Sequence, residues 1–490
     1  MTETLGFCQE TRPEDCGFIL FGATGDLAGR KILPALFRLC EKKLAPKNFY
    51  LLLAGRTPLD RPALESRVWA ALNAAGVSPS QEHFGPFLSR LEYLRADYGS
   101  EEFYSLLERR LTELDARHKA GGRRLFYLAT PPSAYRPIAA GLKAAGLLSG
   151  PAACGRWSRL ILEKPYGESL EDALRLPEEL GEGAEDRLYR IDHFTGKEAV
   201  QNILALRAAN AVFDGTWNAS FVDHVQITVL EELGVAGRAA FFERTGLARD
   251  MMSHLLQLAA VTAMDLPASF RDAEIREEKR RFFSAIRPYS PAEAAELAVR
   301  GQYDGYRLEP GVAAGSAAET FLAFRLSVDN DRWRGVPFYI RAGKKAGLKR
   351  TCIDLVYKKP RQGIFSRMEL GAHNVFSFAI QPEPKVSFSV VGKHPGPKLC
   401  FEPQAMQLDY RPGAAADSPT DYERLLLDAM AGDQTLFLGR DETRFLWDFL
   451  APLLKAWSGA SPAPLHIYPD GTPGPAAADA LPEREGRRWL

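Results

Sequence analysis

The chain has 490 residues, 46% hydrophobic and 25% charged, a composition typical of a soluble globular protein with two or three domains. Lys plus Arg and Asp plus Glu number 62 each, so no overall charge favours nucleic acid or an anionic membrane as a partner. The acidic N-terminus predicts no signal peptide, and no apolar run reaches the roughly 18 residues of a membrane span. Six cysteines without metal-ligand spacing favour free thiols in the cytoplasm: Cys8, Cys16, Cys40, Cys154, Cys352 and Cys400.

Strands alternate with helices in the first part of the chain. Short apolar runs predict buried strands at 17–22, 48–54, 124–130 and 159–162. Amphipathic patterns predict helices at 60–76 and 100–119. This alternation is typical of a parallel, doubly wound sheet. We therefore expect an α/β Rossmann-type domain that binds a nucleotide over residues 1–194.

The pattern changes after residue 194. Strand-like runs follow one another at 222–230, 320–328, 336–341, 352–358, 374–381 and 385–391. Helical patterns cover 196–210, 245–263, 291–298, 419–431 and 441–457. Because these strands lack regular crossover helices, we expect a larger α+β domain over residues 195–490, with a mainly antiparallel sheet and helices on one face. The Pro-, Gly- and Ala-rich segment 469–480 predicts a loop or a loose tail.

A glycine-rich turn follows the first expected strand. It reads Gly22-Ala-Thr-Gly25-Asp-Leu-Ala28, a variant of the dinucleotide fingerprint, and a helical pattern comes after it. Glycines let the backbone approach a pyrophosphate, and the helix N-terminus offers N–H groups to it. A glycine turn without a ligand is the alternative. The cofactor contacts that this turn predicts are Gly22, Thr24, Gly25, Asp26 and Leu27.

Arg56 stands directly after the second expected strand. NAD-dependent enzymes usually place an acid here, against the ribose 2′-hydroxyl, whereas an arginine suits the 2′-phosphate of NADP. Arg56, with the Thr24 hydroxyl beside it, therefore predicts NADP, and a surface arginine is the alternative. Strand 124–130 ends at a Pro-Pro turn, which either brings Tyr135 near the cofactor or is purely structural.

Two charged clusters suit a phosphorylated substrate. Lys164 follows strand 159–162 in the run Glu163-Lys164-Pro165, where cofactor and substrate would meet. Asp192, His193 and Lys197 fall within the nine residues 190–198. That run suits a phosphate pocket, a carboxylate that orients a catalytic histidine, or a solvated turn.

His254 lies among apolar residues of the expected helix 245–263. A dehydrogenase that forms a carbonyl needs a base whose pKa lies near the working pH, and histidine fits best. A hydrogen-bonded core histidine is the alternative. A basic run from Arg341 to Arg350, which includes Lys344 and Lys349, suits contacts to a phosphate or to sugar hydroxyls, although basic loops are common.

Ten segments are spread along nearly the whole chain. They read GATGDLA, LATPP, EKPYG, RIDHFTGKEAVQN, GRAAFFERTGLARD, SHLLQL, RGQYDGY, DNDRWRGVPFYIRAGK, ERLLLDAMAGDQTLF and YPDGTPGPAAAD. In their order and spacing they resemble the glucose-6-phosphate dehydrogenase family, and no single segment is decisive.

The resemblance implies that glucose 6-phosphate is oxidised at carbon 1 to 6-phosphogluconolactone, with hydride transfer to NADP, as the first oxidative step of the pentose phosphate pathway. It implies a cytoplasmic homodimer or homotetramer, with the large sheet at the dimer interface and no metal, nucleic acid or membrane.

Site roles follow from the same resemblance. His254 corresponds to the general base and Asp192 to its carboxylate partner. Lys31 and Lys164 correspond to the two lysines between substrate and nicotinamide, and Arg56 to the reader of the 2′-phosphate. The other substrate contacts implied are His193, Lys197, Glu231, Asp250, Lys344 and Lys349.

Two departures from the family's pattern bear on activity. Phe194 replaces a tyrosine whose hydroxyl would hold the phosphate, a loss of about 1–2 kcal/mol of binding free energy unless Thr195 or another group compensates. The run from Asp250 to His254 is one residue shorter than the family's R-D-x-x-Q-N-H, which turns His254 by about 100° in an ideal helix. One hypothesis is that relatives carry a single-residue π-bulge here that this chain lacks.

Two alternatives to the main interpretation follow. One is a family member that prefers another hexose phosphate or NAD. The other is a catalytically weak NADP-binding protein with an assembly or regulatory role, which the shortened run alone favours.

Overall fold

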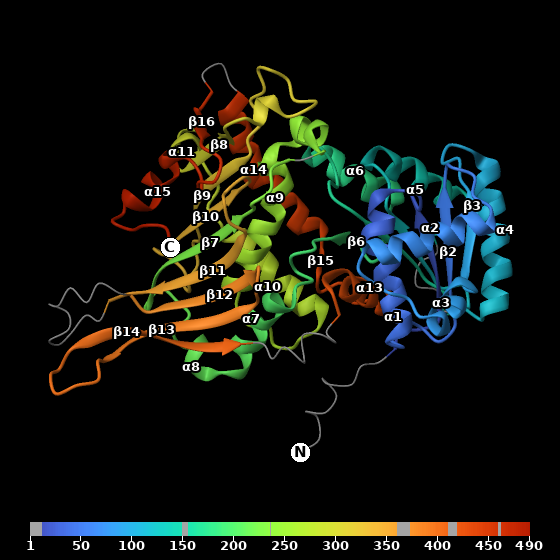
Figure 1. Ribbon diagram of the computed structural model, residues 1–490. Coiled ribbons are helices and arrows are strands. Elements are labelled where there is room, and N and C mark those ends of the chain that lie inside the picture. The colour runs from blue at the N-terminus through green and yellow to red at the C-terminus, as the bar shows by residue number, and fades with distance from the viewer. Residues whose placement is uncertain (1–11, 149–154, 236, 360–372, 410–418, 459–461) are drawn as a thin grey trace. The chain divides into compact units, whose positions relative to one another are not determined.

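The computed structural model describes residues 12–148, 155–235, 237–359, 373–409, 419–458 and 462–490 (Figure 1). These residues form two compact units. The first holds the chain up to Gly196 together with Pro419–Arg440, and the second holds Lys197–Ser418 with Asp441–Leu490. The expected boundary after residue 194 lies close to Gly196, where the chain first leaves the first unit. A single boundary does not include the return of Pro419–Arg440 to that unit.

The first unit is built on a seven-stranded sheet in the order β15-β6-β5-β4-β1-β2-β3. All neighbours pair in parallel except β15, which runs antiparallel to β6. The strands are β1 Cys16–Phe21, β2 Phe49–Gly55, β3 Leu91–Arg95, β4 Arg124–Leu128, β5 Ser158–Leu162, β6 Leu188–Ile191 and β15 Phe437–Leu438. Burial on both faces explains why the central strands β1 and β2 read as continuous apolar runs.

Helices cover both faces of this sheet, and a separate apolar core lies on each face. In Figure 1 the late helix α13 lies beside the early helix α1. The helices are α1 Leu33–Glu41, α2 Arg61–Ala74, α3 Gln81–Leu88, α4 Glu101–His118, α5 Tyr135–Ala144, α6 Leu170–Leu180 and α13 Asp421–Ala431. The expected Rossmann-type, doubly wound domain is confirmed.

The second unit is built on a nine-stranded sheet in the order β14-β13-β12-β11-β7-β10-β9-β8-β16. Only the pairs β7–β10 and β8–β16 are parallel, so the expected mainly antiparallel sheet is confirmed. The strands are β7 Val222–Leu230, β8 Ala298–Tyr303, β9 Phe321–Ser327, β10 Pro337–Gly343, β11 Arg350–Tyr357, β12 Val375–Gln381, β13 Lys385–Lys393, β14 Phe401–Asp409 and β16 Leu465–Tyr468.

The long helix α9 packs against β7, β9 and β10 of this sheet, with α10 beside it (Figure 1). The helices of this unit are α7 Glu198–Ala209, α8 Ala211–Asp214, α9 Ala239–Ala263, α10 Asp272–Ser284, α11 Pro291–Glu296, α14 Arg440–Ser458 and α15 Ala480–Glu483. Segment 469–480 is mainly a loop, with one 3-10 turn at Ala476–Ala478, and the rest of the unit holds it, because the Gly471 amide donates to the Lys345 carbonyl at 2.8 Å.

Four of the six cysteines, Cys16, Cys40, Cys352 and Cys400, are free thiols. The other two, Cys8 and Cys154, lie outside the described residues. Across the described ranges, no helix combines the length and the apolar character needed to cross a membrane.

Candidate functional site

The glycine turn lies at the carboxyl end of β1, as expected. Gly22 has φ +78, and a Cβ on it would stand 2.2 Å from the Ala129 carbonyl oxygen at the end of β4. Only glycine fits there, because both the space and the backbone conformation exclude a side chain. The helix begins at Asp26, so its first N–H groups have no acceptor within the helix.

Around this turn the residues suit a dinucleotide phosphate. Arg56 is exposed directly after β2, and a second arginine, Arg67 of α2, donates to the Thr24 carbonyl. The hydroxyl of Thr130 is buried and has no hydrogen-bond partner among the described residues. Two cations, a glycine cradle and an orphaned hydroxyl fit NADP, with Arg56 and Arg67 available to its 2′-phosphate.

Lys31 lies in one turn of π-helix, Ala28–Ile32, which leads from the glycine turn into α1. Such turns place one extra residue in a helix and occur frequently at functional sites. The Lys31 ammonium lies 5.9 Å from the ring centroid of Tyr422. Tyr422 belongs to α13, more than 380 positions later in the sequence, so the return of 419–440 to this unit completes the surroundings of Lys31.

Glu163 lies directly after β5 and beside Lys164. Its carboxylate accepts hydrogen bonds from the hydroxyls of Tyr127 and Tyr422, the latter at 3.1 Å. Desolvation by burial raises the pKa of Glu163, and these two hydrogen bonds oppose the shift. The network connects the two expected lysines, because Tyr422 contacts Lys31 and Glu163 precedes Lys164.

The peptide bond between Lys164 and Pro165 is cis. The Tyr135 hydroxyl donates to the Glu163 carbonyl at 2.8 Å, and the Tyr166 hydroxyl donates to the Ile191 carbonyl. Tyr135 is buried and its hydroxyl is engaged within the chain. It therefore fixes the backbone next to Lys164, and its direct contact with the cofactor stays a prediction.

The loop after β6 carries the next expected residues. Asp192 is fully buried, and its carboxylate accepts from the Phe194 amide at 3.0 Å, whereas His193 is half-buried. The Thr195 hydroxyl contacts the carbonyl oxygens of Asp192 at 2.7 Å and Leu436 at 2.6 Å. Because its one hydrogen points to buried carbonyls, Thr195 does not compensate for the hydroxyl lost at Phe194.

In the second unit, helix α9 breaks at Gly246, which has φ 61 and ψ 178. The helix restarts there against Glu319: the Leu247 amide donates to its carbonyl and the Ala248 amide to its carboxylate, both at 2.9 Å. Burial raises the pKa of Glu319. From Leu247 to Ala263 the helix is regular α-helix without a π-turn, which is what the bulge hypothesis requires of this chain. The part that concerns relatives stays a hypothesis.

Asp250 and His254 lie one turn apart on this helix, and His254 is buried. One turn further on, Gln257 enters a buried polar triad: its amide donates to Glu442 at 2.8 Å, and Lys279 pairs with Glu442 at 3.0 Å. The triad ties α9 to α10 and α14. The hydroxyl of Ser253 is buried without a hydrogen-bond partner in the described part of the chain.

Glu231 and Lys344 follow the parallel neighbours β7 and β10, so the two side chains emerge side by side and form an ion pair. Lys344 is buried, with its ammonium 5.0 Å from the ring centroid of Phe242. A fixed acceptor beside a fixed donor suits sugar hydroxyls. Lys349 is exposed, and Lys197 is half-buried just before α7.

The structure thus gathers the expected residues into two sets, one in each unit. Sequence reasoning missed Arg67, Tyr127 and Tyr422, whose side chains reach the site from other elements. Their sequence context offers no signal, because a helical arginine and a strand tyrosine are ordinary residues. Tyr422 directly precedes one of the family-like segments, ERLLLDAMAGDQTLF, yet nothing local places it beside Lys31.

Two family descriptions match the chain. Residues 19–202 match "Glucose-6-phosphate dehydrogenase, NAD binding domain", and residues 204–490 match "Glucose-6-phosphate dehydrogenase, C-terminal domain". The glucose-6-phosphate 1-dehydrogenase of Chlamydia pneumoniae is 36% identical over 508 aligned positions, which cover 99% of this chain and 98% of that protein. Glucose-6-phosphate 1-dehydrogenase 2 of Mycobacterium tuberculosis (strain ATCC 25618 / H37Rv) is 37% identical over 490 positions, covering 97% and 94%.

Solved structures agree with these relatives. A glucose-6-phosphate dehydrogenase in complex with its substrate glucose-6-phosphate superposes with a TM-score of 0.88 at 31% identity, covering 98% of this chain and 99% of that one. The glucose-6-phosphate 1-dehydrogenase of Mycobacterium avium gives a TM-score of 0.84 at 30% identity, covering 97% and 99%. The similarity therefore extends over both units.

Proposed function

Since the chain belongs to the glucose-6-phosphate dehydrogenase family, we propose that it oxidises carbon 1 of glucose 6-phosphate to 6-phosphogluconolactone and reduces NADP. The observation that carries this conclusion is similarity over both units, including the fold of a relative solved with glucose-6-phosphate. The chain is an oxidoreductase that uses NADP, and its glycine cradle and the arginines at β2 and α2 fit that cofactor. The nicotinamide supplies the hydride acceptor when it is bound.

Each proposed contact to the sugar has a stated role. His193 and Lys197 bind the phosphate, which lies far from carbon 1, so its binding energy positions the reacting end. The Glu231–Lys344 pair and Asp250 bind sugar hydroxyls, and Lys349 adds a further cation. Lys164 and Lys31 lie between the sugar and the nicotinamide, where Glu163 and Tyr422 hold them in place.

His254 is the proposed general base, which removes the proton from the carbon 1 hydroxyl as the hydride leaves. Two observations support this role. His254 is buried, and polar contacts to Glu319 and within the Gln257–Lys279–Glu442 triad fix the helix that carries it. A neutral imidazole accepts the proton and becomes positively charged, so a carboxylate partner stabilises the product state. Asp192 is that proposed partner.

The first test measures absorbance at 340 nm with glucose 6-phosphate and NADP, for the wild type and for His254→Asn. We expect fast reduction by the wild type and a loss of about 10²–10⁴-fold in kcat for the variant. NAD in place of NADP, and other hexose phosphates in place of glucose 6-phosphate, serve as specificity controls. Binding of NADP without its reduction by any hexose phosphate would contradict the enzymatic function.

We also propose that the protein acts in the cytoplasm, as a homodimer or homotetramer, in the first oxidative step of the pentose phosphate pathway. Support for assembly comes from the edge strand β14, where Met406 and Leu408 are 59% and 53% exposed. Light scattering of the purified protein tests this proposal: a mass of two or four chains supports assembly, and a stable monomer contradicts it.

A further inference from the structure

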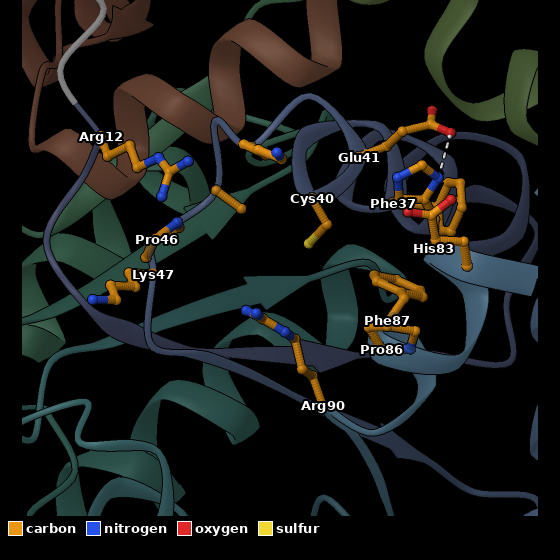
Figure 2. Close-up of a pocket in the computed structure, with 13 residues that line it drawn as sticks. Arg12, Phe37, Cys40, Glu41, Pro46, Lys47, His83, Pro86, Phe87 and Arg90 are labelled. Atoms are coloured by element: carbon orange, nitrogen blue, oxygen red, sulfur yellow. Dashed lines mark ion pairs between the residues drawn. The ribbon is translucent and has the colours of Figure 1, made fainter. Parts of the chain in front are cut away.

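A cavity of about 260 Å³ lies in the first unit at the edge of the sheet where the parallel strands begin. Its walls come from the residues before β1, β2 and β3, from the end of α1 and from α3 (Figure 2). The expected cofactor contacts lie after the strands end. The cavity is therefore separate from the candidate site, and none of the residues assigned so far lines it.

Cations outnumber acids around this cavity. Arg12, Lys43, Lys47 and Arg90 line it, and none of these four has a carboxylate partner among the residues that the structure describes. The lining acids are Glu41, which lies 3.5 Å from a ring nitrogen of His83, and the exposed Glu82. In Figure 2 Glu41 and His83 are at one end of the cavity and Arg12 and Lys47 at the other. One end is therefore positively charged without internal neutralisation.

Apolar side chains form the rest of the wall. Phe37 and Phe87 are both buried, and their rings meet edge to face with centroids 5.3 Å apart. Cys40 lies between these rings and Arg90 in Figure 2. Burial raises the pKa of the Cys40 thiol to about 11, so the thiol is neutral and adds no negative charge to the cavity.

Backbone contacts hold this arrangement before any ligand binds. The amides of Leu44 and Ala45 both donate to the Leu39 carbonyl, which closes the end of α1 and orients Lys43. The Asp15 carboxylate accepts from the backbone and side-chain nitrogens of Asn48, at 2.8 and 2.7 Å, and so fixes the segment that carries Lys47. Preformed sites of this kind lose less entropy on binding.

We propose that this cavity binds a small organic phosphate monoester. Its phosphate lies among the lining cations Arg12, Lys43, Lys47 and Arg90, and its compact apolar or ring portion contacts Phe37 and Phe87. A phosphate dianion with three acceptor oxygens matches cations that approach from several elements better than a carboxylate does. The site goes beyond the proposed function and does not depend on it.

Cys40 gives the experiment a local reporter. The rate of its alkylation by iodoacetamide at pH 9 is followed by mass spectrometry of the Cys40 peptide, with phenyl phosphate or phenol present. We expect phenyl phosphate at ten times its Kd to slow alkylation about tenfold by mass action, and phenol to have little effect. No protection at up to about 10 mM, or equal protection by phenol, would overturn the proposal.

Two variants separate binding from folding. Lys43 has φ 58, a conformation that favours glycine, so Lys43→Gly should keep or raise the melting temperature while it weakens phenyl phosphate binding several-fold. The matched control is Lys119→Gly, because Lys119 has the same φ at the end of α4 but does not line the cavity. Arg90→Ala should abolish the protection. Unchanged affinity in both Lys43→Gly and Arg90→Ala would refute the site.

Discussion

The two units hold their site residues in different ways. In the first unit these residues lie on loops after β1, β2, β5 and β6, and tyrosine hydroxyls fix the loop that carries Lys164. In the second unit the proposed base lies inside a long helix, which Glu319 fixes where the helix restarts after Gly246 and which a buried polar triad fixes further along. Loop positions can change without disturbing a core, whereas the helix contacts are part of the core itself. We therefore expect activity and stability to separate in the first unit and to fall together in the second.

The largest expected effect comes from the triad. Lys279→Met leaves the buried Glu442 carboxylate without its cation and should lower the free energy of unfolding by about 3–5 kcal/mol. Urea denaturation measures this change. The double variant Lys279→Met/Glu442→Met serves as control and should recover most of the loss, because no unpaired charge is then buried. A single variant as stable as the wild type would mean that solvent reaches Glu442.

Gly246→Ala should have the next largest effect. A Cβ there would lie 2.1 Å from a Glu319 carboxylate oxygen, and φ 61 with ψ 178 is a conformation almost restricted to glycine. We expect a loss of about 3 kcal/mol in the free energy of unfolding, together with lower activity, because the helix that carries His254 restarts here.

The matched control is Gly85→Ala in α3, where a Cβ would meet nothing within 4 Å. That change should be neutral or stabilising by up to about 1 kcal/mol. Equal stability of the two variants would contradict the role assigned to the Gly246 break.

Tyr422→Phe tests whether activity and stability separate in the first unit, where loops carry the site residues. It removes one of the two hydroxyl donors to Glu163 but keeps the ring beside Lys31. We expect kcat/KM to fall about tenfold, or 1.4 kcal/mol, with a smaller change in stability. The control is Tyr289→Phe, which removes a similar buried hydrogen bond to Arg325 in the second unit. Loss of activity in both variants, in proportion to lost stability, would remove the distinction between the two units.

The smallest expected effect is a pH dependence at Glu319. Burial raises the pKa of this carboxyl in the folded protein, so the native state binds the proton more tightly than the unfolded chain does. Its contribution to stability is therefore lost as pH rises above about 4.3, the pKa of an unperturbed Glu. Glu319→Gln keeps a neutral acceptor for the Ala248 amide. Its free energy of unfolding should therefore rise relative to that of the wild type as the pH increases from about 4 to about 7. A difference that does not change with pH would refute this interpretation.

Sequence reasoning located the loop residues better than the helix residues, for a physical reason. Gly22, Arg56 and Lys164 each follow an apolar strand that the sequence predicts, and the ends of parallel strands meet at one edge of the sheet. By contrast, His254 is surrounded by apolar neighbours like any core histidine, so residue chemistry left it open whether it is a base or a core residue, and only the family resemblance favoured the base. Pairs such as Glu231 with Lys344 depend on which strands become neighbours, which local patterns do not encode.

The fold class of both domains was correct, but several elements escaped prediction. The short strands β3, β6 and β15 and the helix α10 carry weak or mixed periodicity: α10 reads DAEIREEKRRFFS, with few apolar residues and many charges. The return of 419–440 to the first unit also escaped, because an amphipathic helix does not reveal which core it covers. α13 packs on α1, and its buried Glu423 pairs with Lys42 at 3.1 Å.

This return has a consequence for how the protein is made. The first unit cannot be completed when its N-terminal part leaves the ribosome, because α13 and β15 are translated only after Lys197–Ser418. At about 5–20 residues per second, that interval lasts roughly 10 to 40 seconds. Throughout it, the face of α1 that α13 later covers and the edge of β6 that β15 later pairs with remain open. The nascent protein therefore exposes apolar surface and a free strand edge while Lys197–Ser418 is being synthesised, which is when chaperones would be needed most.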